Sequence, residues 1–262
     1  MPNNHGKLKE DEMYLSLNNK KFANLSPNLR YMLEEMFGAL EADEIITCTQ
    51  PEEFIKPDLL ITYKGKQMGL SMKYGTSNLM HSENIETFIP FLRGLGVSEE
   101  TLKTIVLYQF GDGTYDGSGK VRVPIEELKY RMMKQIKAAN EELNSNEELI
   151  AKVAERLIFQ GVNKDAPKAE AIYHGDVMDG VIVTRPQIIK HIKRKNWNYY
   201  DNLHIGPLFL KAHARYIGKE VVNEKYRRKI DASWPRLLED MTYISKTYFS
   251  YTPISKRTRE DW

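Results

Sequence analysis

Apolar residues first repeat at helical spacing between residues 26 and 40. Ser26-Pro27 is a good helix start, because serine caps a helix and proline suits its first position. The stripe that follows lies on one helix face and consists of Leu29, Met32, Leu33, Met36, Phe37 and Leu40. Residues 1–24 are polar and show no such period. The pattern therefore predicts a flexible N-terminal arm followed by a first helix.

Three β-like runs come next, at residues 44–49, 58–63 and 67–73. Lys64-Gly65-Lys66 forms a tight turn between the second and third runs, which predicts a hairpin. In the third run Met68, Leu70 and Met72 alternate with Gly69, Ser71 and Lys73. Side chains alternate across a strand, so Ser71 and Lys73 share a face opposite the core.

The rest of the chain mixes both periods. Helices are predicted from residue 82, from residue 98, and at about 124–143 and 146–160. A β-like segment at 169–183, a basic helix at 184–195, a strand pair at 203–215 and a last helix at 233–244 complete the order. This order predicts an α/β (mixed α+β) fold with a mixed central sheet flanked by helices. We expect one domain over 25–262, with a core at 26–110, a helical insert at about 124–160 and a basic part at 185–230.

Composition narrows the class of protein. The chain has 262 residues, of which 41% are hydrophobic, so it can bury a sizeable core. One cysteine, Cys48, excludes an internal disulfide and a thiolate zinc site, and suits a reducing cytoplasm. No apolar run reaches the roughly 18 residues of a membrane helix. The first residues have no apolar signal-peptide core. We therefore expect a cytoplasmic protein.

Charge is distributed unevenly along the chain. Residues 185–230 contain 12 Lys and Arg against 3 acids, a local charge of +9, whereas the whole chain carries +2. Such a surplus can bind phosphates and release their counterions, although a solvated charged face is the plainer interpretation. The residues that we expect to bind nucleic acid here are Lys190, Lys193, Arg194, Lys195, Lys211, Arg215, Arg227, Arg228 and Lys229.

The hairpin also holds candidate chemistry, at Asp58 and Lys73. Hydrolysis of a phosphodiester at neutral pH needs a hard cation to polarise the phosphate and activate water. Magnesium prefers carboxylate oxygens, and a nearby lysine can stabilise the anionic transition state. An acid on one hairpin strand and a lysine on its partner can meet, because paired strands lie about 5 Å apart.

The segment KPDLLITYKGKQMGLSMKYG resembles the PD-(D/E)XK pattern of restriction-endonuclease-like nucleases. The preceding helix and strand also match the αβββ opening of that family. The resemblance covers residues 26 to about 95. It implies a restriction-endonuclease-like core, with Asp58 as a metal ligand, the backbone carbonyl of Met72 as another, and Lys73 as the catalytic lysine. The implied cofactor is Mg²⁺, with Mn²⁺ as the alternative ion.

The second acid of the family pattern is Ser71 in this chain. In some restriction endonucleases of the family, a serine stands there and a glutamate on the following helix replaces the acid. Glu83 or Glu86 could fill that role, with Glu83 slightly favoured, and His81 beside them could orient water or phosphate. An acid on the first helix sometimes joins the metal site in this family. Glu35, or its neighbour Glu34, is the candidate.

These inferences together predict a magnesium-dependent endonuclease for double-stranded DNA, of the restriction or phage type and from a bacterial or phage-infected cell. Cutting both strands needs two active sites, so a homodimer is expected. A nucleic-acid-binding protein on the same fold, catalytically decayed at Ser71, is the alternative. A third hypothesis is a protein-interaction module that docks a partner through its helices at 125–160.

Overall fold

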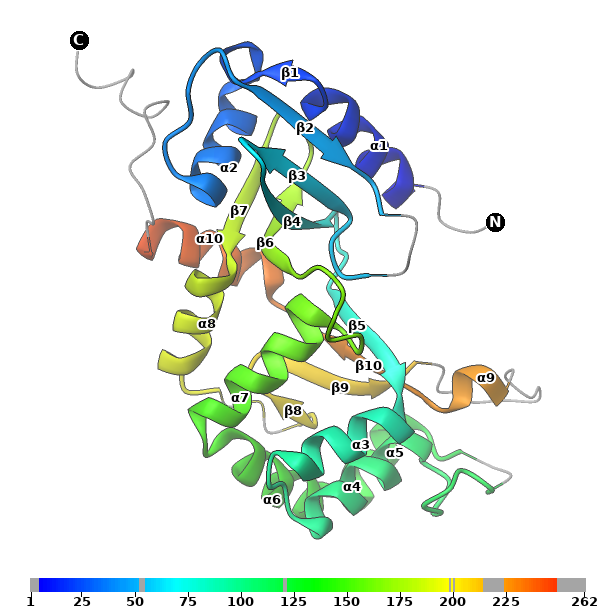
Figure 1. Ribbon diagram of the computed structural model, residues 1–262. Coiled ribbons are helices and arrows are strands. Elements are labelled where there is room, and N and C mark those ends of the chain that lie inside the picture. Colours follow the sequence, from blue (N-terminus) through cyan, green and yellow to red (C-terminus); the bar gives the residue numbers. More distant parts are fainter. Residues whose placement is uncertain are drawn as a thin grey trace. The chain divides into compact units, whose positions relative to one another are not determined.

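The computed structural model describes residues 5–51, 55–119, 122–197, 199, 201–213 and 224–248. These residues form a mixed α/β fold with a six-stranded sheet and a second sheet of four strands (Figure 1). The predicted fold class is confirmed at this level. None of the helices within the described ranges is both long and apolar enough to cross a bilayer.

The chain divides into two compact units, where the sequence predicted a single domain. Unit 1 contains residues 1–77, 158–191 and 236–262, and unit 2 contains residues 78–157 and 192–235. Each unit has its own sheet and its own buried apolar residues. The sequence concealed this division, because unit 2 is inserted in two pieces and no Gly- or Pro-rich linker marks its ends.

Unit 1 is built on the six-stranded sheet, in the order β1-β2-β3-β4-β6-β7. Strands β2, β3 and β4 pair antiparallel, β6 joins β4 in parallel, and β7 pairs antiparallel with β6. The strands are β1 (Lys20–Lys21), β2 (Ile45–Thr49), β3 (Leu59–Tyr63), β4 (Lys66–Lys73), β6 (Ala169–Gly175) and β7 (Gly180–Thr184).

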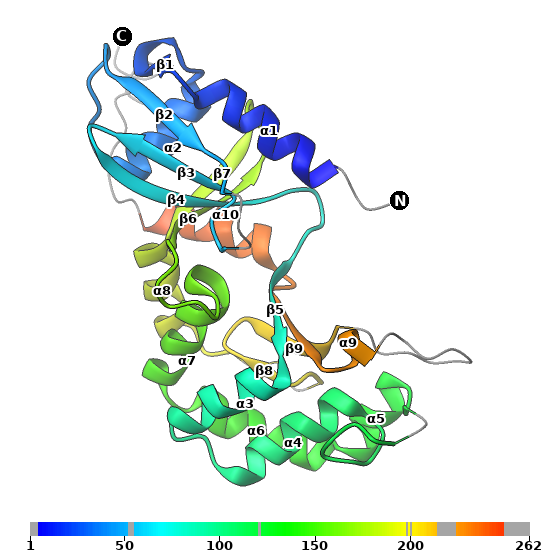
Figure 2. The same ribbon diagram turned by 45° about the vertical axis from the view of Figure 1, so that its right-hand side comes forward.

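The helices of unit 1 include one that the sequence did not predict. Residues His5–Leu17 form α1, although a flexible arm was expected there, and Met13 and Leu17 are fully buried. Two buried apolar positions are too few to show helical periodicity in the sequence, so the helix was not predicted. Figures 1 and 2 show α1 lying along β2, in agreement with their contacts. The others are η1 (Phe22–Asn24), α2 (Pro27–Phe37), most of α8 (Arg185–Arg194) and α10 (Leu237–Thr247).

The predicted hairpin is confirmed. Strands β3 and β4 pair from Leu59 opposite Leu70 to Tyr63 opposite Lys66. The two-residue turn between them places Lys64 at φ 46° and Gly65 at φ 77°. A turn with two positive φ angles matches the twist of a hairpin, and glycine adopts one of them without a steric cost.

Unit 2 pairs the four-stranded antiparallel sheet β5-β10-β9-β8 with a group of helices, of which α4 contacts β9 and α6 contacts β8 (Figure 1). Its strands are β5 (Leu79–Asn84), β8 (His204–Ile205), β9 (Leu208–Ala212) and β10 (Lys229–Ser233). Its helices are α3 (Ile85–Gly94), α4 (Glu99–Phe110), α5 (Ile125–Arg131), α6 (Met133–Asn144), α7 (Glu147–Ala154) and α9 (Glu224–Arg227), and the π-helix η2 (Glu155–Gln160) follows α7.

One boundary changes the interpretation of the site. The sequence predicted a helix from residue 82, but residues 79–84 form strand β5, and the helix begins at Ile85. Strand β10, far away in the sequence, pairs with β5 over Ser82 and Glu83. Residues 79–84 are a strand because of this long-range pairing. The helical spacing of the residues after Asn84 made the sequence predict a helix that starts too early.

Candidate functional site

Asp58 lies directly before β3, and its carboxylate faces the end of β4. The Oδ2 atom of Asp58 accepts hydrogen bonds from the backbone N–H of Met72 at 2.6 Å and from Ser71 Oγ at 3.2 Å. The Asp58 N–H donates to Leu70 O at 2.8 Å. Ser71 therefore donates a hydrogen bond to Asp58 and supplies no negative charge. Ser71 lies beside Asp58, as expected, and its contact helps to position the Asp58 carboxylate.

Close packing fixes the chain just before Asp58. A Cβ atom on Gly69 would lie 2.1 Å from Lys168 O and 2.7 Å from Pro57 Cγ. Only glycine fits this approach, because both contacts are far shorter than van der Waals separation. Pro57 and Gly69 together seat the residue that carries the carboxylate.

Lys73 is the last residue of β4, opposite His174 on the parallel strand β6. Burial lowers the pKa of His174, and the positive charge of Lys73 lowers it further, although a backbone hydrogen bond with Gly75 acts in the opposite direction. The lysine and the imidazole are therefore neighbours. The hairpin places Lys73 at the end of β4 that the Asp58 carboxylate faces.

Glu10 on α1 lies near this group, and sequence analysis did not predict it. Burial raises the pKa of Glu10, the charge of Asp58 raises it further, and the charges of Lys7 and Lys73 act in the opposite direction. Its side chain is 26% exposed, and its Oε2 atom lies 3.8 Å from Lys7 Nζ. Glu10 thus shares one electrostatic environment with Asp58 and Lys73. Residues 1–24 lack a clear apolar period, so their spacing does not predict the helix that carries Glu10.

Tyr74 borders the same group. Burial raises the pKa of the Tyr74 hydroxyl, and the carboxylates of Glu10 and Asp58 raise it further. Its Oη atom lies 3.5 Å from Met72 Sδ. The hydroxyl stays protonated at neutral pH and can donate a hydrogen bond. We define the carboxylate–lysine cluster as Glu10, Asp58, Ser71, Lys73 and Tyr74.

The two carboxylates of the carboxylate–lysine cluster are of the ligand type that magnesium prefers. Two partly buried carboxylates, Glu10 and Asp58, repel each other, and a divalent cation would relieve that repulsion. Magnesium is commonly bound by one or two carboxylates and completes its shell with water. No group of three or more His, Cys, Asp or Glu side chains within the described ranges could hold a metal ion. The Met72 carbonyl as a further ligand stays a prediction.

Glu83 has a different setting from the one expected. It lies on β5 in unit 2, is 5% exposed, and both of its carboxylate oxygens accept hydrogen bonds from Arg156, at 3.0 and 2.7 Å. His81 Nε2 lies 3.5 Å from Glu83 Oε1, and Thr87 Oγ1 donates to Oε2. A carboxylate already neutralised by a guanidinium is a poor metal ligand. Arg156, which the sequence did not predict as a partner, neutralises Glu83, a role that was expected of the metal ion.

The other predicted acids also have protein partners. Glu86, on α3, forms an exposed ion pair with Arg228. Glu35, on α2, is buried and accepts a 3.0 Å hydrogen bond from Gln187 Nε2. The structure therefore brings together Asp58 and Lys73 from the predicted set, and adds Glu10 in place of these acids.

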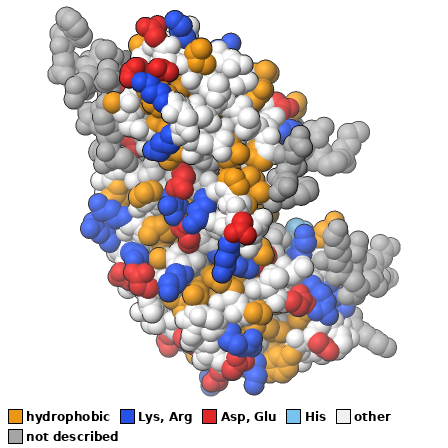
Figure 3. All heavy atoms as spheres, viewed as in Figure 1, with side chains coloured by type: hydrophobic (Ala, Val, Ile, Leu, Met, Phe, Trp, Pro, Cys, Tyr) orange, Lys and Arg blue, Asp and Glu red, His pale blue; other side chains and the backbone are white. Residues whose placement is uncertain are grey.

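Several residues of the basic segment are neutralised by acids. Lys193 pairs with Glu148, Arg227 with Asp112 at 2.8 Å, and Arg228 with Glu86. On the face drawn in Figure 3, basic and acidic side chains lie among one another.

The remaining basic residues differ in their surroundings. Lys190 Nζ lies over the Tyr248 ring, and Lys195 Nζ over the Trp197 ring, at 5.0 and 4.5 Å from the ring centroids. Arg194 is exposed on α8. Arg215 lies outside the described residues. Lys211 and Lys229 lie on the sheet of unit 2, at β9 and β10.

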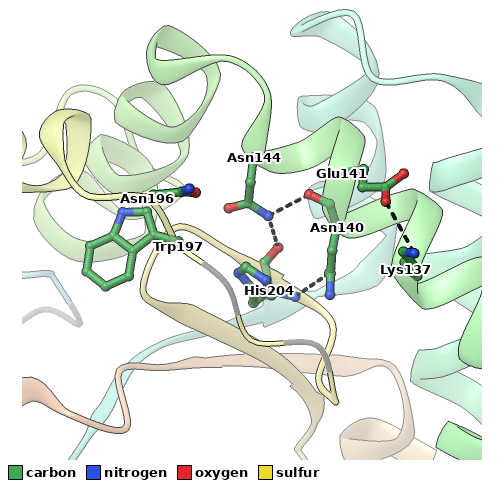
Figure 4. A pocket seen from close by; sticks show the side chains of 7 residues that line it. All are labelled: Lys137, Asn140, Glu141, Asn144, Asn196, Trp197 and His204. Carbon is green, nitrogen blue, oxygen red and sulfur yellow. Dashed lines mark hydrogen bonds and ion pairs between the residues drawn. The ribbon is translucent and has the colours of Figure 1, made fainter.

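Unit 2 also contains a pocket of about 260 Å³, lined by Lys137, Asn140, Glu141, Asn144, Asn196, Trp197 and His204 (Figure 4). Its central amides serve the fold. Asn140 Oδ1 accepts from His204 N at 3.0 Å, and Asn144 bonds both His204 O and Gly206 N. These amides hold β8 in place, so their presence in the pocket has a structural reason and does not indicate a ligand site.

Comparison with known proteins gave no matching family model and no similar curated sequence. Function must therefore be argued from the residues and their geometry.

Proposed function

We propose that this protein is a metal-dependent endonuclease that hydrolyses phosphodiester bonds of double-stranded DNA, with its active site in unit 1. The observation that carries the proposal is the position of the Asp58 carboxylate at the end of β4, bonded to Ser71 and Met72 and so next to Lys73 in that strand. Glu10 lies close enough for the charges of Asp58 and Lys73 to act on its pKa. Carboxylates near an ammonium are suited to a hard divalent cation and a phosphate.

The strand order supports the same proposal. Helix α2 followed by the antiparallel strands β2, β3 and β4 agrees with the αβββ opening of restriction-endonuclease-like nucleases. Strand β6 then joins β4 in parallel, beside the lysine. Fold alone does not define activity, and the proposed activity therefore depends on the residues of the carboxylate–lysine cluster.

Each residue of the cluster has a role in the proposed reaction. Glu10 and Asp58 would hold Mg²⁺ or Mn²⁺. When bound, that ion would polarise the phosphate and lower the pKa of the attacking water. Lys73 would stabilise the negative charge that grows on the phosphate oxygens. Ser71 Oγ and the Met72 N–H fix the orientation of the Asp58 carboxylate.

Plasmid cleavage tests this proposal. Purified wild type should nick or linearise supercoiled plasmid with Mg²⁺, and Lys73→Ala and Asp58→Asn should each lower the rate by at least about a hundredfold. Lys66→Ala is the matched control, because Lys66 is exposed at the other end of β4 and its loss changes the charge equally. Circular dichroism would verify the fold. Full-rate cleavage by Lys73→Ala would contradict the assignment.

The oligomeric state follows from the substrate. A single active site cuts one strand, so concerted duplex cleavage would require two copies and a homodimer is part of the proposal. Sedimentation on DNA, with the appearance of linear rather than nicked product, tests it.

Ser71 favours a second candidate, a nucleic-acid-binding protein without activity. Its hydroxyl donates to Asp58 where the family pattern has a metal-binding acid. This alternative predicts salt-sensitive DNA binding with no cleavage in Mg²⁺ or Mn²⁺.

A further inference from the structure

One face of the unit 2 sheet carries two lysines near His213, a histidine that is fixed by a hydrogen bond to Asp231. Leu208, Leu210 and Ala212 of β9 are buried, whereas Lys211 between them is exposed, so Lys211 faces away from the buried side. Asp231 lies opposite Lys211 on the neighbouring strand β10. Lys229, two residues before Asp231, shares its face because side chains alternate along a strand.

His213, just after β9, is fixed within this group. Its Nδ1 atom lies 2.9 and 3.1 Å from the two Asp231 carboxylate oxygens, so Nδ1 carries the hydrogen. The His213 N–H donates to Lys229 O at 3.0 Å. Asp231 is only 10% exposed and the imidazole 34% exposed. The carboxylate thereby orients the ring and leaves Nε2 as the histidine's contact for a ligand.

An exposed aromatic ring borders the same cations. The Tyr226 ring lies 5.4 Å from the His213 ring, and Lys229 Nζ lies 5.8 Å from its centroid. Tyr226 is 39% exposed. Phosphate backbones are bound by lysine together with tyrosine and other hydrogen-bonding side chains, and aromatic rings stack on exposed bases.

Lys211 and Lys229 also differ from the other cations of the basic segment. Lys193, Arg227 and Arg228 each have an acidic partner. Across the part of the chain that the structure describes, no ion pair to an acid involves Lys211 or Lys229. Their charges remain available to an external anion.

We propose that Lys211, His213, Tyr226 and Lys229, the unit 2 patch, bind the sugar-phosphate backbone of a nucleic acid, independently of any metal ion. Charge complementarity selects an extended polyanion, because the cations lie on two neighbouring strands. The choice of nucleic acid among polyanions rests on the proposed nuclease function. The unit 2 patch would bind the nucleic acid, while the carboxylate–lysine cluster would carry out the hydrolysis.

The test is DNA binding by the full chain in EDTA, with a short fluorescent duplex and anisotropy over a range of salt concentrations. Replacing both lysines (Lys211→Gln with Lys229→Gln) should raise Kd about tenfold and lower the salt slope by about 1.8, because each phosphate contact contributes about 0.9. The matched control replaces two exposed lysines on helices, with Lys103→Gln and Lys134→Gln. Its slope should equal that of wild type.

Four outcomes are decisive. Equal affinity and slope for the patch and control variants would overturn the proposal. Competition by polyglutamate as strong as by unlabelled DNA of equal charge would overturn the choice of nucleic acid. Binding that depends on the two lysines, in a wild type that never cleaves plasmid, would support the patch and reject the nuclease function. His213→Gln, which keeps the charge of both lysines, should weaken binding less, and a loss larger than that of the double variant would contradict the patch.

Discussion

Each unit contains a partly or fully buried glutamate in a charged cluster, and the two glutamates respond in opposite directions. In unit 1, burial and the charge of Asp58 raise the pKa of Glu10. In unit 2, burial would raise the pKa of Glu83, but hydrogen bonds and charges from His81 and Arg156 outweigh it and lower the pKa to about 2.

This contrast separates the proposed site from a structural ion pair. Glu83 has its compensating charge within the protein, so a ligand has little to add there. Glu10 lies near the charge of Asp58 and pairs with Lys7 on its own helix at 3.8 Å, and its pKa is still raised. Perturbed carboxylates gather at functional sites, but structural ion pairs also perturb pKa values. Glu10 and Glu83 differ both in the direction of the pKa shift and in its cause.

The largest expected effect is on the Glu83 pair. Arg156→Met should destabilise unit 2 by about 3–5 kcal/mol, because Glu83 would stay buried without its cation. Urea unfolding followed by the fluorescence of Trp197 and Trp234, both in unit 2, measures it. Arg131→Met is the control, since its pair with Glu127 is exposed and worth less than about 1 kcal/mol. Equal losses in the two variants would remove the contrast.

Glu10→Gln should act on activity and stability in opposite directions. Plasmid cleavage should fall by at least about a hundredfold, a loss comparable to that of one transition-state contact. The melting temperature at neutral pH should stay equal or rise, because the folded-state pKa of Glu10 is raised and its ionisation therefore opposes folding. Glu12→Gln on the same helix should leave cleavage unchanged. A stability loss with intact cleavage would make Glu10 a structural residue.

Acid should separate the two clusters. The stability from Glu83 is fully present above its unfolded pKa of 4.5 and is lost as pH falls from 4.5 toward about 2. Glu10, with its raised pKa, takes up a proton at higher pH than an ordinary glutamate. Cleavage should therefore decline at a higher pH than that at which Trp fluorescence reports unfolding. Coincident transitions would contradict this order.

The smallest effect is expected at the Glu86 ion pair. Arg228→Met should change the free energy of unfolding by less than about 1 kcal/mol, because both side chains of the pair are about half exposed. The same urea titration measures it. A loss as large as that of Arg156→Met would show that exposure does not separate the two glutamates.

Local signals predicted much of unit 1. The serine cap and apolar stripe located α2, and the alternation with a Lys-Gly turn located the β3–β4 hairpin. These features depend on residues close in the sequence, so propensity and period are sufficient to find them. The hairpin likewise placed Asp58 and Lys73 at one strand end.

The neighbours of those residues in the folded protein could not be predicted from the sequence. Strand β5 exists because β10, about 145 residues later in the chain, pairs with it, and Glu83 is neutralised by Arg156 through packing within unit 2. Glu10 joins Asp58 because Met13 and Leu17 bury one side of α1 against the sheet.

The sequence by itself determined the β3–β4 hairpin and the positions of Asp58 and Lys73 on it, because turn residues and the alternation of apolar side chains are local signals. Only the tertiary structure decided which acid meets Asp58 and Lys73, because that meeting depends on the burial of apolar surface between segments far apart in the chain.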